Sequence, residues 1–204
     1  MYKNNIHPLN TIDGETLMSL PMEPMNFVVD SLISQGLHIL AGAPKVGKSW
    51  LALWLATTIA KGEPVWNLQT KQGTTLYLCL EDSTRRIQNR LFSITDEVPS
   101  NVRFCTESSI LEKGLEQQLT QFLKEYPDTV LIIIDTLQKI RGVKMTTPTP
   151  MTIATSLCSS ALQISTALPS CSFIICAKKV TKMCSTASPE LLPSAVRWIP
   201  ASHW

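Results

Sequence analysis

The chain has 204 residues, which is enough for one domain with a hydrophobic core, and its formal net charge of +2 does not by itself require a nucleic-acid partner. No stretch approaches the roughly 18 apolar residues of a membrane span, and the N-terminus lacks a basic-then-apolar signal pattern, so we expect a cytoplasmic chain without a membrane partner. The six cysteines form no C-x-x-C pair, which predicts free thiols rather than disulfides or zinc ligands.

The N-terminal part of the chain begins with a polar lead-in and continues into a first strand and helix. Residues 1–26 are interrupted by Met and Pro, so we expect them to be loosely ordered. Phe27 to Gln35 predicts a short helix or ledge before the first strand. The apolar run Leu37 to Ala41 predicts that strand, and Trp50 to Ala60 predicts a helix behind it.

Between this strand and this helix lies the pattern G-x-x-x-x-G-K-S, which is typical of a loop that binds nucleotide phosphates. It consists of Gly42, Ala43, Pro44, Lys45, Val46, Gly47, Lys48 and Ser49. In such a loop the backbone N–H groups point at an anion, and the following helix adds the partial positive charge of its N-terminus. We expect Lys48 to reach the β- and γ-phosphates and the Ser49 hydroxyl to bind Mg²⁺. The strand–loop–helix context disfavours the alternative, a chance Gly-rich turn.

The elements after the loop helix alternate between strands and helices. Thr74 to Leu80 predicts a buried strand, and Thr84 to Ile94 predicts a helix. Asn101 to Cys105 predicts a short strand, and Leu111 to Tyr126 an amphipathic helix. Thr129 to Asp135 is the clearest buried-strand pattern in the chain. This alternation predicts an α/β fold in which helices flank both faces of a parallel sheet.

Carboxylates follow two of the predicted strands. Asp135 ends an aliphatic strand, which is where nucleotide-binding sites place the Asp that holds the Mg²⁺ shell. Glu81 follows the strand behind the loop helix, where it would orient or deprotonate an attacking water. The alternative for Glu81 is a carboxylate that only interacts with the dipole of the next helix. Asp82 and Ser83 are expected to cap that helix.

In combination, these segments resemble the RecA-like P-loop ATPases of the RepA replicative-helicase type, which are common on plasmids, phages and other mobile elements of bacteria. The resemblance covers about residues 24–142. It rests on the Gly42 to Ser49 loop, on Leu76 to Ser83 with Arg85 and Arg86 behind it, and on Ile134 to Lys139. It implies an ATP·Mg²⁺ site and Glu81 as the catalytic carboxylate.

The resemblance also implies partners and further parts of the chain. The family acts on DNA during replication and forms ring homo-oligomers that bind ATP between subunits. Downstream of Asp135 it implies a strand that ends in a His-His pair and senses the γ-phosphate. A Gly/Ser/Thr-rich segment with a late Arg is implied to serve the neighbouring site. Neither part stands in this sequence as written.

Residues 143–204 differ in composition from the preceding residues. All eight glycines lie at or before Gly142, while the last 62 residues hold 18 Ser/Thr and six Pro, with Glu190 as the only acidic residue. A parallel-sheet ATPase needs Gly at its turns and helix ends. We therefore expect a RecA-like core over residues 27–142 and an out-of-frame tail over residues 143–204 that stops early, so that this chain has weak activity or none.

The genetic code supports a reading slip near Val143 to Met145. When each codon is taken from the last base of one codon and the first two of the next, Phe173 to Lys179 permits His-His-Leu-Arg-Lys-Glu. In the same frame Pro189 to Ala201 permits Gly-Thr-Thr-Ala-Ile-Ser-Gly-Ala-Val-Asp-Thr-Ser. Both strings match the downstream parts that the resemblance implies. Ser172 to Ala177 stays apolar after such a slip and would imitate the missing strand.

Three functions follow from these observations. The first is an ATPase motor that acts on the DNA of a mobile element. The second is a non-catalytic fragment that binds ATP weakly or not at all. The third is a small-molecule P-loop kinase, which would need an Arg-rich lid and an acceptor pocket. No such lid is evident in the sequence, and a Glu at the position of Glu81 favours the motor class.

Overall fold

The structure, a computed structural model, describes residues 11–21, 24–140 and 172–177. Its centre is a five-stranded sheet in the order β3–β7–β6–β4–β5, and every neighbouring pair of strands is parallel. The sheet strands are β3 Gly36–Ala41, β4 Thr74–Cys79, β5 Val102–Cys105, β6 Thr129–Asp135 and β7 Ser172–Ala177. The α/β fold and the parallel sheet that the sequence predicts are thereby confirmed.

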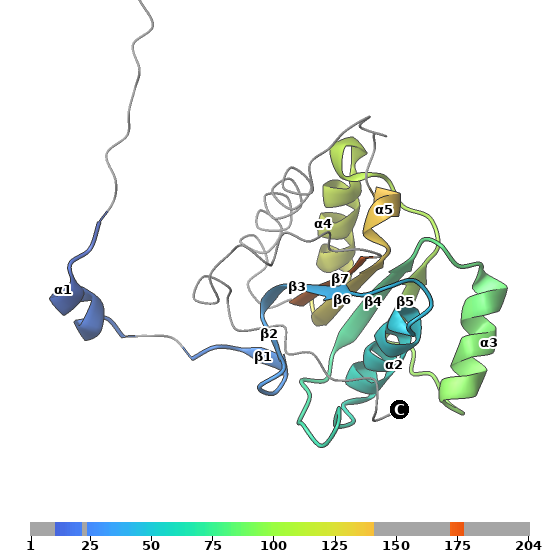
Figure 1. Ribbon diagram of the computed structural model, residues 1–204, viewed down its shortest axis with the longest axis horizontal. Helices are drawn as coiled ribbons and strands as arrows, with labels where there is room; N and C mark the ends of the chain where they lie inside the picture. The colour runs from blue at the N-terminus through green and yellow to red at the C-terminus, as the bar shows by residue number, and fades with distance from the viewer. Residues whose placement is uncertain (1–10, 22–23, 141–171, 178–204) are drawn as a thin grey trace, which may run out of the picture.

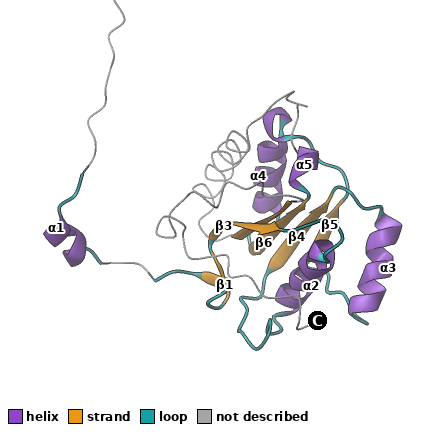
Figure 2. Ribbon diagram, in the orientation of Figure 1, coloured by secondary structure: helices purple, strands orange, loops and turns teal. Residues whose placement is uncertain are grey.

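Helices cover both faces of this sheet, as Figures 1 and 2 show. On one face α2 Lys48–Lys61 and α3 Thr84–Ile94 pack on the sheet, and on the other face lie α4 Leu115–Glu125 and α5 Leu137–Ile140. Alternate side chains of β4 and β6 enter the two resulting cores, and every residue of these two strands is buried. Continuous burial is what a strand between two helical layers requires, and it explains the unbroken aliphatic run of β6.

Two predicted elements differ from the structure. Phe27 to Gln35 forms no helix but an antiparallel hairpin of β1 Phe27–Val29 and β2 Ile33–Ser34. The β-branched residues here favour extended backbone, and Ser31 makes the turn with φ +56°. The predicted helix over Leu111 to Tyr126 is divided, because Gly114 has φ +114°. A short 3₁₀ turn, Leu111–Lys113, precedes this glycine, and α4 starts directly after it.

The lead-in contains one short helix, α1 Gly14–Ser19, which has no buried residue and lies apart from the sheet in Figure 1. Asp13 caps it by accepting a hydrogen bond from the Thr16 backbone N–H at 2.9 Å. No helix among the described residues is long and apolar enough to cross a membrane.

The strand β7 joins the two parts of the sheet that carry the sequence motifs. It pairs with β3 over its whole length, from Gly36 with Ser172 to Ala41 with Ala177. On its other side it pairs with β6, where Cys176 stands opposite Asp135. The strand expected at Ser172 to Ala177 is therefore present. The rest of the expected out-of-frame tail, residues 143–171 and 178–204, lies outside the described residues.

Gly73 provides a test of the packing at the start of β4. A Cβ added to it would lie 2.5 Å from the carbonyl oxygen of Asp128 and 2.6 Å from Cγ1 of Val130. Gly73→Ala is expected to lower the free energy of unfolding by about 1–3 kcal/mol, because overpacking forces backbone shifts. The control is Gly14→Ala, where an added Cβ meets nothing within 4 Å and the change is expected to stay below about 0.5 kcal/mol. Urea denaturation compares the two, and equal stability would contradict this packing.

Candidate functional site

The Gly42 to Ser49 segment links the carboxyl end of β3 to the N-terminus of α2. The backbone at Lys45 has φ +67°, and Gly47, which caps α2, has φ +90°. Gly is the residue that adopts such values without steric cost, so Gly47 lets the chain turn from the loop directly into the first turn of the helix. The strand–loop–helix arrangement predicted from the sequence is confirmed.

The first glycine of the motif meets a different requirement. A Cβ at Gly42 would lie 3.2 Å from Cγ2 of Val46 and 3.7 Å from Cδ of Lys48. The loop therefore curls closely over its own beginning, and a larger residue at Gly42 would press on the side chains of Val46 and Lys48. Such a tight curl brings backbone N–H groups of the loop toward one point, which is the arrangement that binds an anion.

The Lys48 ammonium group is held inside this curl. Its Nζ atom donates hydrogen bonds to the carbonyl oxygens of Gly42 at 2.9 Å and of Ala43 at 2.7 Å. These contacts keep a full positive charge at the start of α2, where the helix dipole already favours an anion. A phosphate entering the loop would find this charge within reach of small changes in the lysine side chain.

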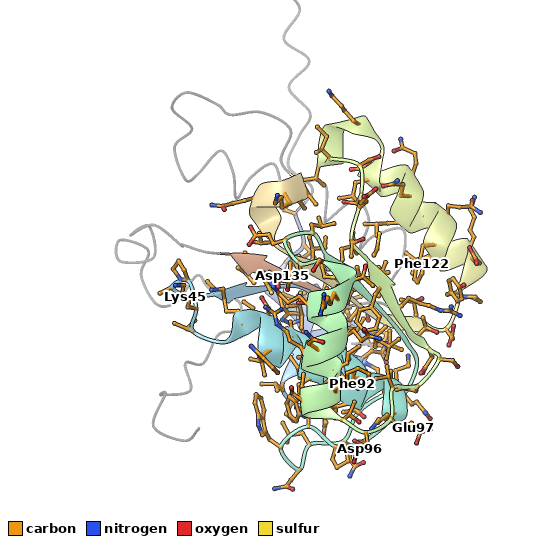
Figure 3. The ribbon with its side chains drawn as sticks, turned by 90° about the vertical axis from the view of Figure 1, so that its right-hand side faces the viewer. Lys45, Phe92, Asp96, Glu97, Phe122 and Asp135 are labelled. Atoms are coloured by element: carbon orange, nitrogen blue, oxygen red, sulfur yellow. The ribbon has the colours of Figure 1, made fainter. Side chains whose placement is uncertain are left out.

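Asp135 lies at the carboxyl end of β6 and only 8% of it is exposed. Its Oδ2 atom accepts a hydrogen bond of 2.9 Å from the Tyr77 hydroxyl. The same hydroxyl lies 3.4 Å from the carbonyl oxygen of Ser49 in the first turn of α2. The structure thus brings Asp135 and Ser49, which are far apart in the sequence, to opposite sides of one hydroxyl group. Figure 3 shows Asp135 among the side chains at the end of the sheet, while Lys45 lies at the outer side of the loop.

The environment of Tyr77 keeps its hydroxyl protonated. Burial raises the pKa of Tyr77 far above its usual value, and the negative charge of Asp135 raises it further. The hydroxyl therefore remains a hydrogen-bond donor throughout the neutral pH range. Sequence reasoning did not select Tyr77. The available signal was a single polar group within the otherwise apolar run from Leu76 to Cys79.

The donor atoms at this place fit Mg²⁺. The Ser49 hydroxyl and the Asp135 carboxylate are hard oxygen ligands, and Mg²⁺ in phosphate sites uses one or two carboxylates together with substrate phosphates and water. Within the described ranges no group of three or more His, Cys, Asp or Glu residues could hold a metal ion alone. A metal bound between Ser49 and Asp135 would consequently depend on oxygen atoms of the nucleotide.

Glu81 lies at the same end of the sheet. Its strand β4 is paired with β6 so that Cys79 stands opposite Asp135, and the Leu80 backbone N–H donates to the Asp135 carbonyl oxygen at 2.8 Å. Glu81 follows in the turn that leaves the strand, and its side chain is exposed. Both predicted carboxylates thus stand at the carboxyl ends of adjacent parallel strands, which is where ligands bind in such sheets.

The residues after Glu81 attach the turn to α3. Ser83 is the N-cap of α3, as predicted, and accepts from the Arg86 backbone N–H. Asp82 does not cap the helix but binds two arginines of α3 through its two oxygens, Arg86 at 3.0 Å and Arg90. The guanidinium of Arg90 also lies 5.6 Å from the ring centroid of Trp50 on α2. The turn that carries Glu81 is therefore tied to both helices on this face of the sheet.

Comparisons with known proteins agree with this geometry. The family model described as "AAA domain" matches residues 6–157, which is more than half of the chain. Two solved structures share the fold. One is an isolated ATPase domain, with a TM-score of 0.52 and 13% identity. The other is a DnaB-like replicative helicase, described with its interactions with primase, with a TM-score of 0.53 and 14% identity. A search of curated proteins finds no match.

The two structural matches cover 70% of this chain in each case, but only 57% and 38% of the respective solved chains. At these identities the likeness concerns the fold, which is that of RecA-like helicase ATPase domains. The RecA-like fold that the sequence motifs implied is thereby confirmed. This chain spans only part of the length of either protein.

Proposed function

This chain belongs to the AAA domain family of nucleotide-binding ATPases, and on that premise we propose that it binds ATP with Mg²⁺ at the carboxyl ends of β3, β6 and β4. The observation that carries the proposal is the Gly42 to Ser49 loop with the Lys48 ammonium inside its curl. In the proposed complex the residues Gly42, Ala43, Pro44, Lys45, Val46, Gly47, Lys48 and Ser49 surround the phosphates. Lys48 then exchanges its two carbonyl contacts for oxygens of the β- and γ-phosphates.

The proposed metal site lies between the loop and β6. When Mg²⁺ is bound, it neutralises charge on the β- and γ-phosphates. The Ser49 hydroxyl and the Asp135 carboxylate are its proposed protein ligands, and the support for this role is their position on either side of the Tyr77 hydroxyl. Asp135 acts directly or through a bound water, since both forms occur for Mg²⁺.

Glu81 is the proposed catalytic carboxylate. From the turn after β4 it would accept a proton from a water that attacks the γ-phosphate, or orient that water. Support comes from its place beside Asp135 at the end of the adjacent strand and from the attachment of its turn to α3 through Asp82. The finer role that we propose is DNA replication of a mobile element, in the manner of RepA-type ring helicases. That role rests on the resemblance of the motifs.

A second proposed function, favoured by the composition of residues 143–204, is nucleotide binding without turnover. The segment has no Gly and only one acidic residue, Glu190. We propose that it is translated out of frame, so that β7 replaces an evolved strand. The coding DNA tests this directly: an open alternative frame after codon 142 that encodes a His-His pair supports the proposal. Stop codons in that frame, or a frame without these motifs, would contradict it.

The proposed binding function is tested by titrating the purified chain with the fluorescent analogue N-methylanthraniloyl-ATP, once with Mg²⁺ and once with EDTA. We expect saturable binding that Mg²⁺ strengthens and unlabelled ATP reverses. ATP hydrolysis, measured in parallel with and without single-stranded DNA, separates the two functions: DNA-stimulated turnover supports the motor, and binding without turnover supports the non-catalytic protein. No saturable binding would contradict both.

A further inference from the structure

Tyr77 places one polar atom inside the otherwise apolar core between the sheet and α2. The residue is 1% exposed, stands at the middle of β4, and packs its ring against Phe104 of β5 with ring centroids 6.2 Å apart. Its direct neighbour on the other strand is Ile133. The hydroxyl therefore reaches diagonally along β6, two residues further, to Asp135. Long side chains span such diagonal positions in a sheet.

Packing alone would be served equally well by phenylalanine at this position. The hydroxyl adds a polar group that is costly to bury unless it is hydrogen-bonded. Here it is satisfied by Oδ2 of Asp135 at 2.9 Å, with the carbonyl oxygen of Ser49 at 3.4 Å as a second, weaker neighbour. Both neighbours belong to residues that the proposed function assigns to the metal. The hydrogen bond thus links β6 to the first turn of α2.

We propose that Tyr77 is a positioning residue for the metal site: its hydroxyl fixes the Asp135 carboxylate at Oδ2 and thereby directs Oδ1 toward the space beside Ser49. A carboxylate at the end of a strand can rotate about χ2, which is a broad torsion. A single charge-assisted hydrogen bond to one oxygen removes most of that freedom. Tyr77 itself touches neither metal nor nucleotide in this role, and it acts through Asp135.

This inference rests on the proposed ATP·Mg²⁺ site, but it makes a separate prediction. Partners that orient metal ligands typically contribute about 10–100-fold to metal affinity. If Tyr77 orients Asp135, removing its hydroxyl must weaken nucleotide binding only when the metal is present. If the hydroxyl merely supports packing, its removal must weaken binding equally with and without Mg²⁺.

Tyr77→Phe tests this distinction, because it removes one oxygen and keeps the ring. We measure the affinity for N-methylanthraniloyl-ATP in Mg²⁺ and in EDTA and compare the ratio of the two affinities with that of the wild type. The ratio is expected to fall about tenfold, while the affinity in EDTA stays within about twofold. The matched control is Tyr126→Phe, which removes a hydroxyl behind α4 on the other side of the sheet and is expected to leave the ratio unchanged.

A double-mutant cycle with Asp135→Asn identifies the route of the effect. In the Asp135→Asn background, Tyr77→Phe is expected to have no further effect on the ratio, since its action requires the carboxylate. An unchanged ratio in Tyr77→Phe, an equal loss in Mg²⁺ and EDTA, or an additive loss in the double variant would overturn the positioning role. A wild-type chain that binds nucleotide equally well in Mg²⁺ and EDTA would overturn the metal site itself, and this outcome is read from the wild type alone.

Discussion

Lys48→Ala is expected to weaken the binding of ATP·Mg²⁺ by a factor of roughly 10 to 100. In the structure the ammonium group lies inside the loop on the carbonyl oxygens of Gly42 and Ala43. Hydrogen bonds that involve a charged group contribute about 1.5–3 kcal/mol, and a difference of about 1.4 kcal/mol corresponds to a factor of ten in affinity. Alanine removes both the charge and the donors and leaves the phosphates with the backbone N–H groups alone. Isothermal titration calorimetry of wild type and variant measures the loss.

The matched control for this prediction is Lys71→Ala. Lys71 is an exposed lysine shortly before β4, at the amino ends of the strands and therefore opposite the loop. Its replacement removes the same formal charge from the chain and is expected to leave the affinity within about twofold, because surface charges at such a distance are largely screened. Circular dichroism spectra of both variants establish that the fold is kept. An affinity of Lys48→Ala equal to that of the control would contradict the proposed role of the loop.

Glu81→Gln is expected to reduce any ATP turnover of the wild type by at least about 100-fold, which is the lower range of what a general base contributes. The amide keeps the size of the side chain but accepts no proton. Binding of ATP·Mg²⁺ is expected to stay within about twofold, because in the proposed complex Glu81 contacts the attacking water and not the phosphates. Steady-state phosphate release and calorimetric binding, measured on the same preparation, separate these two effects.

The control for Glu81→Gln is Glu97→Gln, an exposed carboxylate beyond the end of α3. Figure 3 labels Glu97 near the lower end of the molecule, well away from Asp135. This variant is expected to hydrolyse ATP like the wild type. Equal turnover in Glu81→Gln and wild type would remove Glu81 from the mechanism and leave the interpretation as a residue that interacts with the helix dipole.

The sequence determines those parts of the fold whose signals are local and repeated. The strand predicted over Thr129 to Asp135 has the same bounds in the structure, because an unbroken aliphatic run fits a strand that is buried on both faces. The helix predicted over Thr84 to Ile94 also has the observed bounds, since Ser83 provides its N-cap. The phosphate loop follows from eight adjacent residues whose spacing carries its own geometry.

Other features depend on contacts between distant segments and could not be read from a local pattern. Phe27 to Gln35 was wrong as a helix, because a hairpin is selected by strand pairing and by the positive φ at Ser31. The tie between Asp82 and the arginines of α3 requires the turn after β4 to point back at the helix. The hydrogen bond of Tyr77 requires β4 to lie beside β6, and an apolar run shows neither its neighbour nor its register.

The strand β7 illustrates how a weak signal can satisfy a strong requirement. The place between β3 and β6 needs an apolar, extended segment with its backbone groups available for pairing, and Ser172–Ala177 meets that need. At its carboxyl end, however, Cys176 stands opposite Asp135. The related motifs imply a His-His pair on this strand, which would sense the γ-phosphate. Under the proposed reading slip the strand completes the sheet but brings no such sensor to the site.

The most direct test of this account is a crystal structure of the chain with Mg²⁺ and a non-hydrolysable ATP analogue. We predict that the β- and γ-phosphates lie within the Gly42 to Ser49 loop, that Lys48 Nζ has left the carbonyl oxygens of Gly42 and Ala43 for the phosphates, and that Asp135 faces the metal. A nucleotide bound elsewhere, with Lys48 still on these two carbonyl oxygens, would contradict the account.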